Sequence, residues 1–231
     1  MAKTSTEVQR GQSDPSTAPA AHAERAGDPP KDVETRTAAH EAERTVADET
    51  AESSRRPGMA EAPRDATNIS AQVVSFLSSR DLRLATAESC TAGLIASYLA
   101  SVPGSGSCLD VGFVSYSPSG KAGFLGVKES TMKQFGLTSE EVAREMAEGA
   151  LRHEGCCADV VVSNTGLAEA GPSGSPPAGT QCFAWSFRTR DATVVTFSET
   201  RQFSGSRNEV RSEAALYALS RIEHYFNQLP S

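Results

Sequence analysis

The segment at residues 158–163, with the sequence ADVVVS, constrains the fold more than any other part of the chain. Three consecutive β-branched valines with no alternating polar residue are typical of a strand that is buried on both faces. A strand of this kind needs a layer of helices on each side of its sheet. Later in the chain, residues 180–188 and 192–203 predict an antiparallel pair of strands that turns at Arg190-Asp191. The sequence therefore predicts the α/β class, as a three-layer α/β/α sandwich with a mixed sheet.

Apolar spacing and end signals place the other elements. We expect strands over residues 82–88 and 110–117, and helices over 68–77 and 91–102. A further helix is expected to begin at a capping box over residues 138–141. The last helix carries one continuous apolar stripe. The stripe consists of Ala215, Leu219, Ile222, Phe226 and Leu229.

Residues 1–66 differ in composition from the rest of the chain. They contain no Leu, Ile, Phe, Tyr or Trp, and their 9 basic and 13 acidic residues give a net charge of −4. A segment this poor in apolar side chains cannot bury enough surface to offset its loss of conformational entropy. We therefore expect a disordered, low-complexity tail, acting as a solvating extension or, alternatively, as an arm that binds a partner. Residues 67–231 are expected to form a single domain.

The charge distribution disfavours some classes of function. The chain of 231 residues has a net charge of −7, and its basic residues are spread along it instead of forming a patch. This pattern argues against a nucleic-acid partner. No apolar run is long enough to cross a bilayer, and the N-terminus lacks the layout of a secretory signal or a transit peptide. We expect a cytoplasmic protein with no nucleic-acid or membrane partner.

The cysteines and histidines predict neither a disulfide framework nor a metal site. The five cysteines are odd in number and show no paired CxxC spacing. Two of the four histidines lie in the tail, so no histidine cluster remains to bind a metal or to activate a serine. Any hydrolase in this chain is expected to work without histidine.

Ser89 follows the expected strand 82–88 directly and begins the next helix-like segment. A side chain at this junction lies at the carboxyl edge of the sheet, where ligands of open α/β folds bind. The N–H groups from Cys90 to Ala92 are expected to point outward and to stabilise an oxyanion beside the Ser89 hydroxyl. Two alternatives stay open. Ser89 is also a preferred helix N-cap, and Cys90 is a competing nucleophile, although it has no basic neighbour in the sequence.

Tyr116 and Lys121 lie where the expected strand 110–117 ends. A lysine whose pKa is lowered by desolvation can activate a serine, with a tyrosine to relay or position the proton. If neighbouring strands bring these two side chains and Ser89 to one edge of the sheet, they form a candidate catalytic set. Each also has a simple structural interpretation, Tyr116 as an aromatic at the sheet edge and Lys121 as a solvated loop charge.

Two further segments carry candidate binding groups. Residues 164–180 are rich in Gly, Pro and Ser and include Gly166, so their N–H groups are candidates for holding an anion or a substrate ring. The same segment is consistent with a long surface connection. Arg207 and Arg211 lie one helical turn apart at the start of the last helix and are candidates for gripping a phosphate. They are equally consistent with ordinary surface arginines.

Four segments, in order, resemble the pattern of the CinA C-terminal domain family. That pattern is roughly TAESCTGG, GFVTYSNEAK, TGIAGP with a Gly-rich stretch and KPVGTV, and F-x-GDR-x-x-VR. The chain matches it with TAESCTAG from residue 86, GFVSYSPSGK from residue 112, the 164–180 segment, and FSGSRNEVR from residue 203. The resemblance extends over nearly all of residues 70–229.

The resemblance implies hydrolysis of the carboxamide of nicotinamide mononucleotide, a small-molecule nucleotide, to nicotinate mononucleotide and ammonia. It implies Ser89 as the nucleophile and Tyr116 and Lys121 as its activating partners, with the choice of base between these two left open. It also implies the α/β/α fold, no metal and no organic cofactor, and it is compatible with a homo-oligomer. The candidate substrate-binding residues are Glu88, Cys90, Thr91, Ala92, Gly166, Arg207 and Arg211. Among them, Glu88 is expected to orient the turn or to hold a charged neighbour.

The chain departs from the family pattern at positions that bear on activity. Ala92 stands where TGG has a glycine, and its methyl group adjoins the expected oxyanion site. The segment 167–172, LAEAGP, is two residues longer than IAGP and adds the acid Glu169, while Pro176 replaces the lysine before PVGT and Ser206 the aspartate of GDR. Two alternative functions therefore stay open, namely a catalytically impaired nucleotide-binding module and a serine amidase for another small amide.

Overall fold

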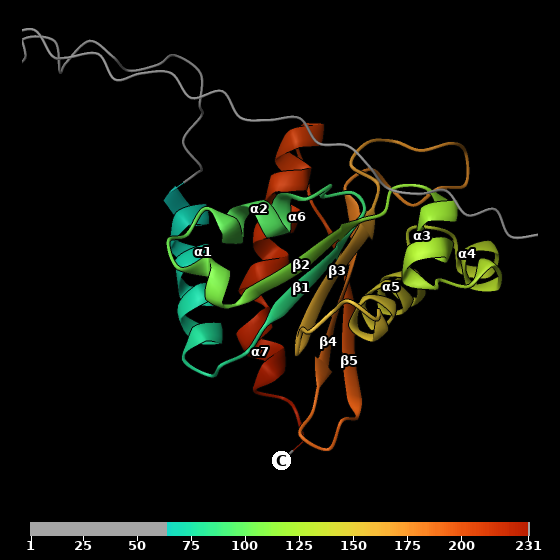
Figure 1. Ribbon diagram of the computed structural model, residues 1–231. Helices are drawn as coiled ribbons and strands as arrows, with labels where there is room; N and C mark the ends of the chain where they lie inside the picture. Colours follow the sequence, from blue (N-terminus) through green and yellow to red (C-terminus); the bar gives the residue numbers. More distant parts are fainter. Residues whose placement is uncertain (1–63, 231) are drawn as a thin grey trace, which may run out of the picture. The chain divides into compact units, whose positions relative to one another are not determined.

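The structure is a computed structural model of the chain in which residues 64–230 are described (Figure 1). The helices are α1 (Arg64–Ser78), α2 (Leu94–Ala100), α3 (Pro118–Leu125), α4 (Glu129–Phe135), α5 (Glu140–Arg152), α6 (Arg207–Ser220) and α7 (Ile222–Phe226), with a short 3-10 helix at Ser105–Ser107. The strands are β1 (Leu84–Glu88), β2 (Leu109–Val114), β3 (Val160–Gly166), β4 (Thr180–Arg188) and β5 (Val194–Gln202).

The strands form one sheet in the order β2-β1-β3-β4-β5. β1 is parallel to both β2 and β3, whereas β4 is antiparallel to both β3 and β5. The register pairs Glu88 at the end of β1 with Val114 of β2 and with Asn164 of β3, so the three parallel strands end near one edge of the sheet. The predicted mixed sheet is confirmed, as is the late antiparallel pair.

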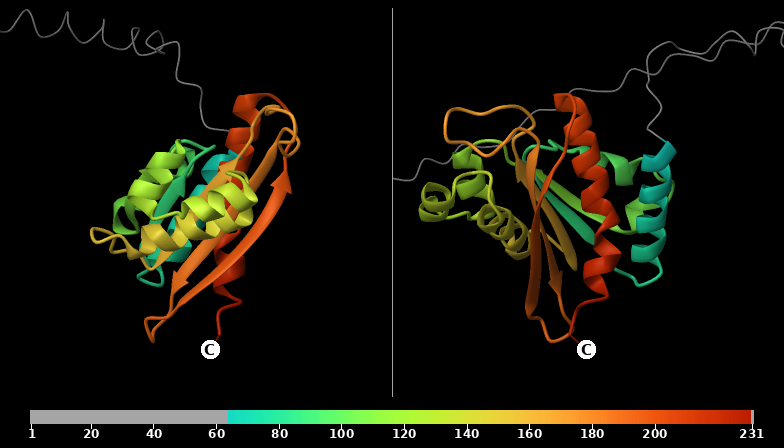
Figure 2. Two further views of the ribbon diagram at one scale, coloured as in Figure 1. Left: turned by 90° about the vertical axis from the view of Figure 1, so that its right-hand side faces the viewer. Right: turned by 180° about the vertical axis from the view of Figure 1, so that it is seen from behind.

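Helices cover both faces of this sheet, with α1, α2, α6 and α7 on one face and α3, α4 and α5 on the other (Figure 1, Figure 2). The valines of β3 alternate between two cores. Val160 and Val162 pack with Trp185 beneath the first group of helices, and Val161 packs with Met146 beneath the second. This alternation explains why the valine run has no polar residue, and it confirms the three-layer sandwich.

Several helix boundaries differ from the expected ones. α1 begins at Arg64 and so includes four residues before the expected start. α5 has Ser139 as its N-cap, because the Ser139 hydroxyl accepts the N–H of Val142 at 3.3 Å. The N-cap is therefore Ser139 and not Thr138, and the expected capping box over 138–141 was wrong. The predicted stripe of the last helix packs on the core, but it is divided between α6 and α7, and Leu229 lies beyond the end of α7.

Helix α3 was not predicted. Its sequence, PSGKAGFL, contains two glycines, which have low helix propensity and hide the helical period. The helix is stabilised at its start, where Pro118 occupies the first turn and the Ser117 hydroxyl accepts the N–H of Gly120 at 3.0 Å. As a result Lys121 lies on a helix and not in a loop.

The predictions for residues 1–66 fall almost entirely outside the described residues, so the tail and the domain boundary at residue 67 stay predictions. The described part begins with α1, whose Val73, Val74 and Leu77 pack into the core as their helical spacing predicts. Within residues 64–230, none of the helices combines the length and the hydrophobicity that a membrane span requires.

Candidate active site

The turn at residues 89–93 connects β1 to α2. Ala92 and Gly93 have left-handed backbone conformations, with φ of 51° and 92°, and Gly93 is the N-cap of α2. The helix therefore begins at Leu94 and not at residue 91, and the alternative in which Ser89 caps it was wrong. An alanine in this conformation is strained where a glycine would not be, and Ala92 stands where the family pattern has a glycine.

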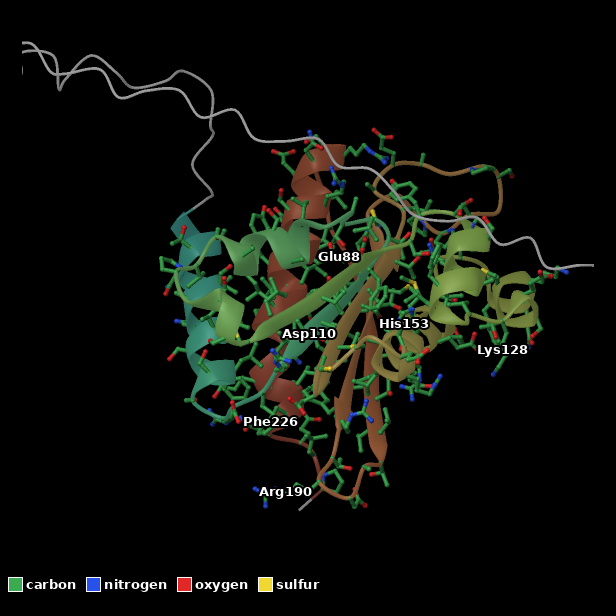
Figure 3. The ribbon with its side chains drawn as sticks, viewed as in Figure 1. Glu88, Asp110, Lys128, His153, Arg190 and Phe226 are labelled. Carbon is green, nitrogen blue, oxygen red and sulfur yellow. The ribbon has the colours of Figure 1, made fainter. Side chains whose placement is uncertain are left out.

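Glu88 takes the place of a capping residue for α2. Its buried carboxylate accepts hydrogen bonds from the N–H groups of Gly93, Ile95 and Ala96 at 2.8, 3.1 and 3.0 Å. The negative charge also lies at the positive end of the helix dipole. Figure 3 shows Glu88 at the end of β1 beside α2. The geometry agrees with the expectation that Glu88 orients the turn.

The Lys121 amine lies beside the Ser89 hydroxyl. Nζ of Lys121 is 2.7 Å from Oγ of Ser89, 2.8 Å from the carbonyl oxygen of Ser115 and 3.4 Å from that of Tyr116. The Lys121 side chain reaches this position from α3 and is only 1% exposed. The structure thus brings Ser89 and Lys121 together from two elements, and the interpretation of Lys121 as a solvated charge was wrong.

Burial makes Lys121 a weaker base than an ordinary lysine. Desolvation lowers the pKa of its ammonium from 10.5 to about 8, against a smaller opposing effect of a charge on the Cys90 thiol. None of the ion pairs within residues 64–230 includes Lys121. With a pKa near 8, a fraction of roughly one tenth is neutral at pH 7. Lys121 can therefore act as a proton acceptor near neutral pH.

The Tyr116 side chain points to the rim of the site. Its hydroxyl accepts a hydrogen bond from Nη2 of Arg207 at 2.8 Å, and the residue is 56% exposed. Only its carbonyl oxygen contacts the Lys121 amine. The expected role of Tyr116 as a proton relay stays a prediction.

A chain of amide groups supports the turn from the sheet side. The N–H of Thr91 donates to Oδ1 of Asn164 at 3.1 Å, and Nδ2 of Asn164 donates to Oε1 of Gln181 at 3.0 Å. Nε2 of Gln181 then donates to Sγ of Cys90 at 3.4 Å. Asn164 and Gln181 were not predicted. Both are completely buried polar residues, and their amide groups satisfy each other and the turn.

The two predicted arginines do not converge on one ligand. Nε and Nη2 of Arg211 donate to the carbonyl oxygens of Cys90 and Thr91 at 3.0 and 3.1 Å, so this guanidinium holds the main chain of the turn. Arg207, one helical turn earlier, reaches the rim, where Nη1 lies 3.4 Å from Oε2 of Glu169. Arg211 does not line the pocket, and its role as a candidate phosphate contact stays a prediction.

A pocket of about 310 Å³ opens at the carboxyl edge of the sheet. The predicted site residues that line it are Ser89, Cys90, Tyr116, Lys121, Gly166 and Arg207. Four other predicted residues support the turn without lining the pocket, namely Glu88, Thr91, Ala92 and Arg211. Within residues 64–230, no group of three or more His, Cys, Asp or Glu side chains is arranged to hold a metal ion.

The remaining lining residues were not predicted as site residues. They are Leu137, Thr138, Thr165, Leu167, Ala168, Glu169 and Ala170. Those at 165–170 lie at or beyond the end of β3. Their position was predictable, because ligands of open α/β folds bind at the edge where the parallel strands end. Leu137 carries no such signal, because it is brought to the pocket by tertiary packing that includes a 2.8 Å hydrogen bond from the Thr165 hydroxyl to its carbonyl oxygen.

The model of the CinA C-terminal domain family matches residues 66–226. A putative competence-damage inducible protein of Symbiobacterium thermophilum is 43% identical over 157 residues, which are 65% of this chain and 36% of that protein. The nicotinamide-nucleotide amidohydrolase PncC of Enterobacter agglomerans is 42% identical over 154 residues, which are 65% of this chain and 89% of that protein.

The fold is similar to that of a solved structure, the competence damage-inducible protein A of Klebsiella pneumoniae. The TM-score is 0.65 at 32% identity, and the match covers 71% of this chain and 99% of that one. The chain thus spans about a third of the Symbiobacterium protein but nearly the whole of the shorter relatives. From the family model, the identity to these relatives and the common fold, the chain belongs to the CinA C-terminal domain family.

Proposed function

We propose that the chain is an amidohydrolase that converts nicotinamide mononucleotide and water to nicotinate mononucleotide and ammonia. The observation that carries the proposal is the 2.7 Å contact between Nζ of a buried Lys121 and Oγ of Ser89 at the base of a pocket. The name of the PncC relative, which is 42% identical, supports the choice of substrate.

The surroundings of Lys121 suit a neutral amine. Such an amine has two N–H donors and one lone pair. The carbonyl oxygens of Ser115 and Tyr116 are placed to accept the two N–H bonds, which leaves the lone pair directed at the Ser89 hydroxyl. In the proposed first step, Lys121 takes the hydroxyl proton while Oγ of Ser89 attacks the carboxamide carbon.

The N–H of Cys90 is the proposed donor to the oxyanion. The other two candidate N–H groups are engaged, Thr91 with Asn164 and Ala92 with the Ser89 carbonyl oxygen at 3.1 Å. By contrast, Cys90 N–H donates to no other residue in the part of the chain that the structure describes. A donor next to the nucleophile can face the carbonyl oxygen as that oxygen becomes negative.

The remaining steps use the same amine. The Lys121 ammonium returns its proton to the amide nitrogen, the C–N bond breaks, and ammonia leaves an ester on Ser89. A water molecule then gives a proton to neutral Lys121 and attacks the ester. Cleavage of the ester bond releases the carboxylic acid, and Ser89 recovers its proton, so that one water is consumed in each cycle.

Arg207 is the proposed contact for the phosphate of the substrate. It lines the pocket together with Ser89 and Lys121, and a planar guanidinium matches two phosphate oxygens. Its hydrogen bond to the Tyr116 hydroxyl holds one edge of the guanidinium in place.

The proposed function is tested by ammonia release from nicotinamide mononucleotide. The full-length protein is expected to release ammonia, and Ser89→Ala to lower the rate by a factor on the order of a thousand or more. Ser101→Ala is the matched control, because Ser101 is an exposed serine at the end of α2 that does not line the pocket. It should retain the wild-type rate.

Other outcomes would support the alternatives. Ammonia release that persists in Ser89→Ala contradicts the proposed nucleophile. Binding of the nucleotide without any release by the wild-type protein would indicate a binding module, which the altered 167–172 segment makes a reasonable competitor. Release from other small amides in preference to the nucleotide would indicate a serine amidase of different specificity.

A further inference from the structure

Glu169 is the one carboxylate among the residues that line the pocket. It lies in the segment 167–172, which is longer than the corresponding part of the family pattern. Oε2 of Glu169 is 3.4 Å from Nη1 of Arg207, and Nη2 of the same guanidinium donates to the Tyr116 hydroxyl at 2.8 Å. Both terminal nitrogens of the proposed phosphate contact are therefore already engaged.

The contact between Glu169 and Arg207 is open to water. Their side chains are 65% and 45% exposed. Exposed ion pairs are weak because solvent screens the two charges. A ligand whose anionic group carries two negative charges or binds the guanidinium more tightly can therefore displace the Glu169 carboxylate.

A phosphate monoester would use the N–H groups of Arg207 that Glu169 now engages. If the carboxylate stays close after it is displaced, it repels the dianion that replaced it. A nicotinamide nucleoside has no phosphate to compete with Glu169 for Arg207, and the charge that it carries is the positive charge of its pyridinium ring. The competition for Arg207 thus acts on ligands with a phosphate and not on ligands without one.

We propose that Glu169 is a specificity-determining residue whose carboxylate competes with the substrate phosphate for Arg207. It thereby lowers the preference of the pocket for phosphorylated over unphosphorylated nicotinamide nucleosides. This inference rests on the proposed function for the nature of its ligand. The opposite role, in which Glu169 holds Arg207 ready for the phosphate, predicts an effect of opposite sign.

The test compares Glu169→Gln, which removes the charge and keeps the size, with Glu129→Gln. Glu129 is an exposed acid of α4 that pairs with Lys133 at 3.5 Å and does not line the pocket, so its variant is matched in charge and in loss of an ion pair. Glu169→Gln is expected to lower KM for nicotinamide mononucleotide about threefold to fivefold and to leave KM for nicotinamide riboside unchanged. Glu129→Gln should change neither value.

A double-mutant cycle shows whether the effect passes through Arg207. In an Arg207→Ala background, Glu169→Gln is expected to lose its gain for the mononucleotide. An unchanged or higher KM for the mononucleotide in the single variant overturns the inference. An equal gain for the riboside overturns it as well, because Glu169 would then not discriminate by the phosphate.

The inference can be tested apart from turnover. If the wild-type protein releases no ammonia, the proposed function fails, and titration with inorganic phosphate then decides the role of Glu169. Glu169→Gln should bind phosphate about threefold or more tightly than the wild type if the carboxylate competes for Arg207. Equal affinities would overturn the inference.

Discussion

Lys121 is almost completely buried and has no acidic partner among the described ion pairs, which is rare for a lysine. Its pKa of about 8 lies below the value of 10.5 for an exposed lysine, so the folded protein binds fewer protons than the unfolded chain between these values. Stability therefore rises with pH across this window, and below pH 8 the folded protein carries the full cost of the buried charge. The property that makes Lys121 a usable base thus lowers stability at neutral pH.

Lys121→Met tests this cost, because methionine keeps much of the volume and removes the charge. At pH 7 the free energy of unfolding should rise by up to ~3 kcal/mol, and the difference should shrink toward pH 10, because above pH 8 the amine of the folded wild type is neutral and the buried charge is gone. Urea denaturation at the two pH values measures it. Lys133→Met, an exposed lysine of α4, is the control and should change the free energy by less than ~0.5 kcal/mol. A Lys121→Met protein less stable than wild type at pH 7 would show that the hydrogen bonds of the amine outweigh its desolvation.

At the scale of elements, the site depends on the turn that connects β1 to α2. Strand 82–88 and a following helix were predictable from apolar spacing, but the left-handed residues 92 and 93 and the role of Glu88 were not. A carboxylate that caps a helix from five residues before its N-cap gives no sequence signal, because its position depends on the tertiary path of the turn. The contact of the Arg211 guanidinium with the main chain of the turn was not predictable for the same reason.

Glu88→Gln tests the support of this element. Glutamine preserves the size but replaces two carboxylate acceptors with one carbonyl, so at least one of the three N–H groups that Glu88 accepts loses a charged partner. The free energy of unfolding is expected to fall by about 1–3 kcal/mol, as measured by chemical denaturation. Glu148→Gln is a suitable control, since Glu148 pairs with Arg152 at 3.6 Å on the surface of α5. If Glu88→Gln loses no more free energy of unfolding than the control, Glu88 does not stabilise the turn.

At the scale of the whole molecule, the valine run of β3 and the late antiparallel pair were sufficient to predict the layers and the mixed sheet. The ends of the expected strands 82–88 and 110–117 indicated the edge at which Ser89 and Lys121 meet. Helix α3 was missed because its glycines hide the helical period. The direction of Tyr116 was not predictable, since it depends on a partner 91 residues away in the sequence.

Several expectations for the whole protein stay predictions. They are the disordered tail over residues 1–66, the cytoplasmic location, the lack of nucleic-acid and membrane partners, and a homo-oligomeric state. Charge and composition motivated the first three, and the family resemblance is compatible with the fourth.

The central claim is that neutral Lys121 takes the proton of Ser89, and the pH dependence of kcat/KM for nicotinamide mononucleotide tests it most directly. Because the free protein needs this amine unprotonated, kcat/KM should rise about tenfold per pH unit below a pKa of about 8 and level off above it. The Lys121→Met protein should show no rise of kcat/KM with pH and should lose nearly all of the activity. A flat profile from pH 6 to pH 9, or a Lys121→Met protein that keeps the wild-type profile, would contradict the claim.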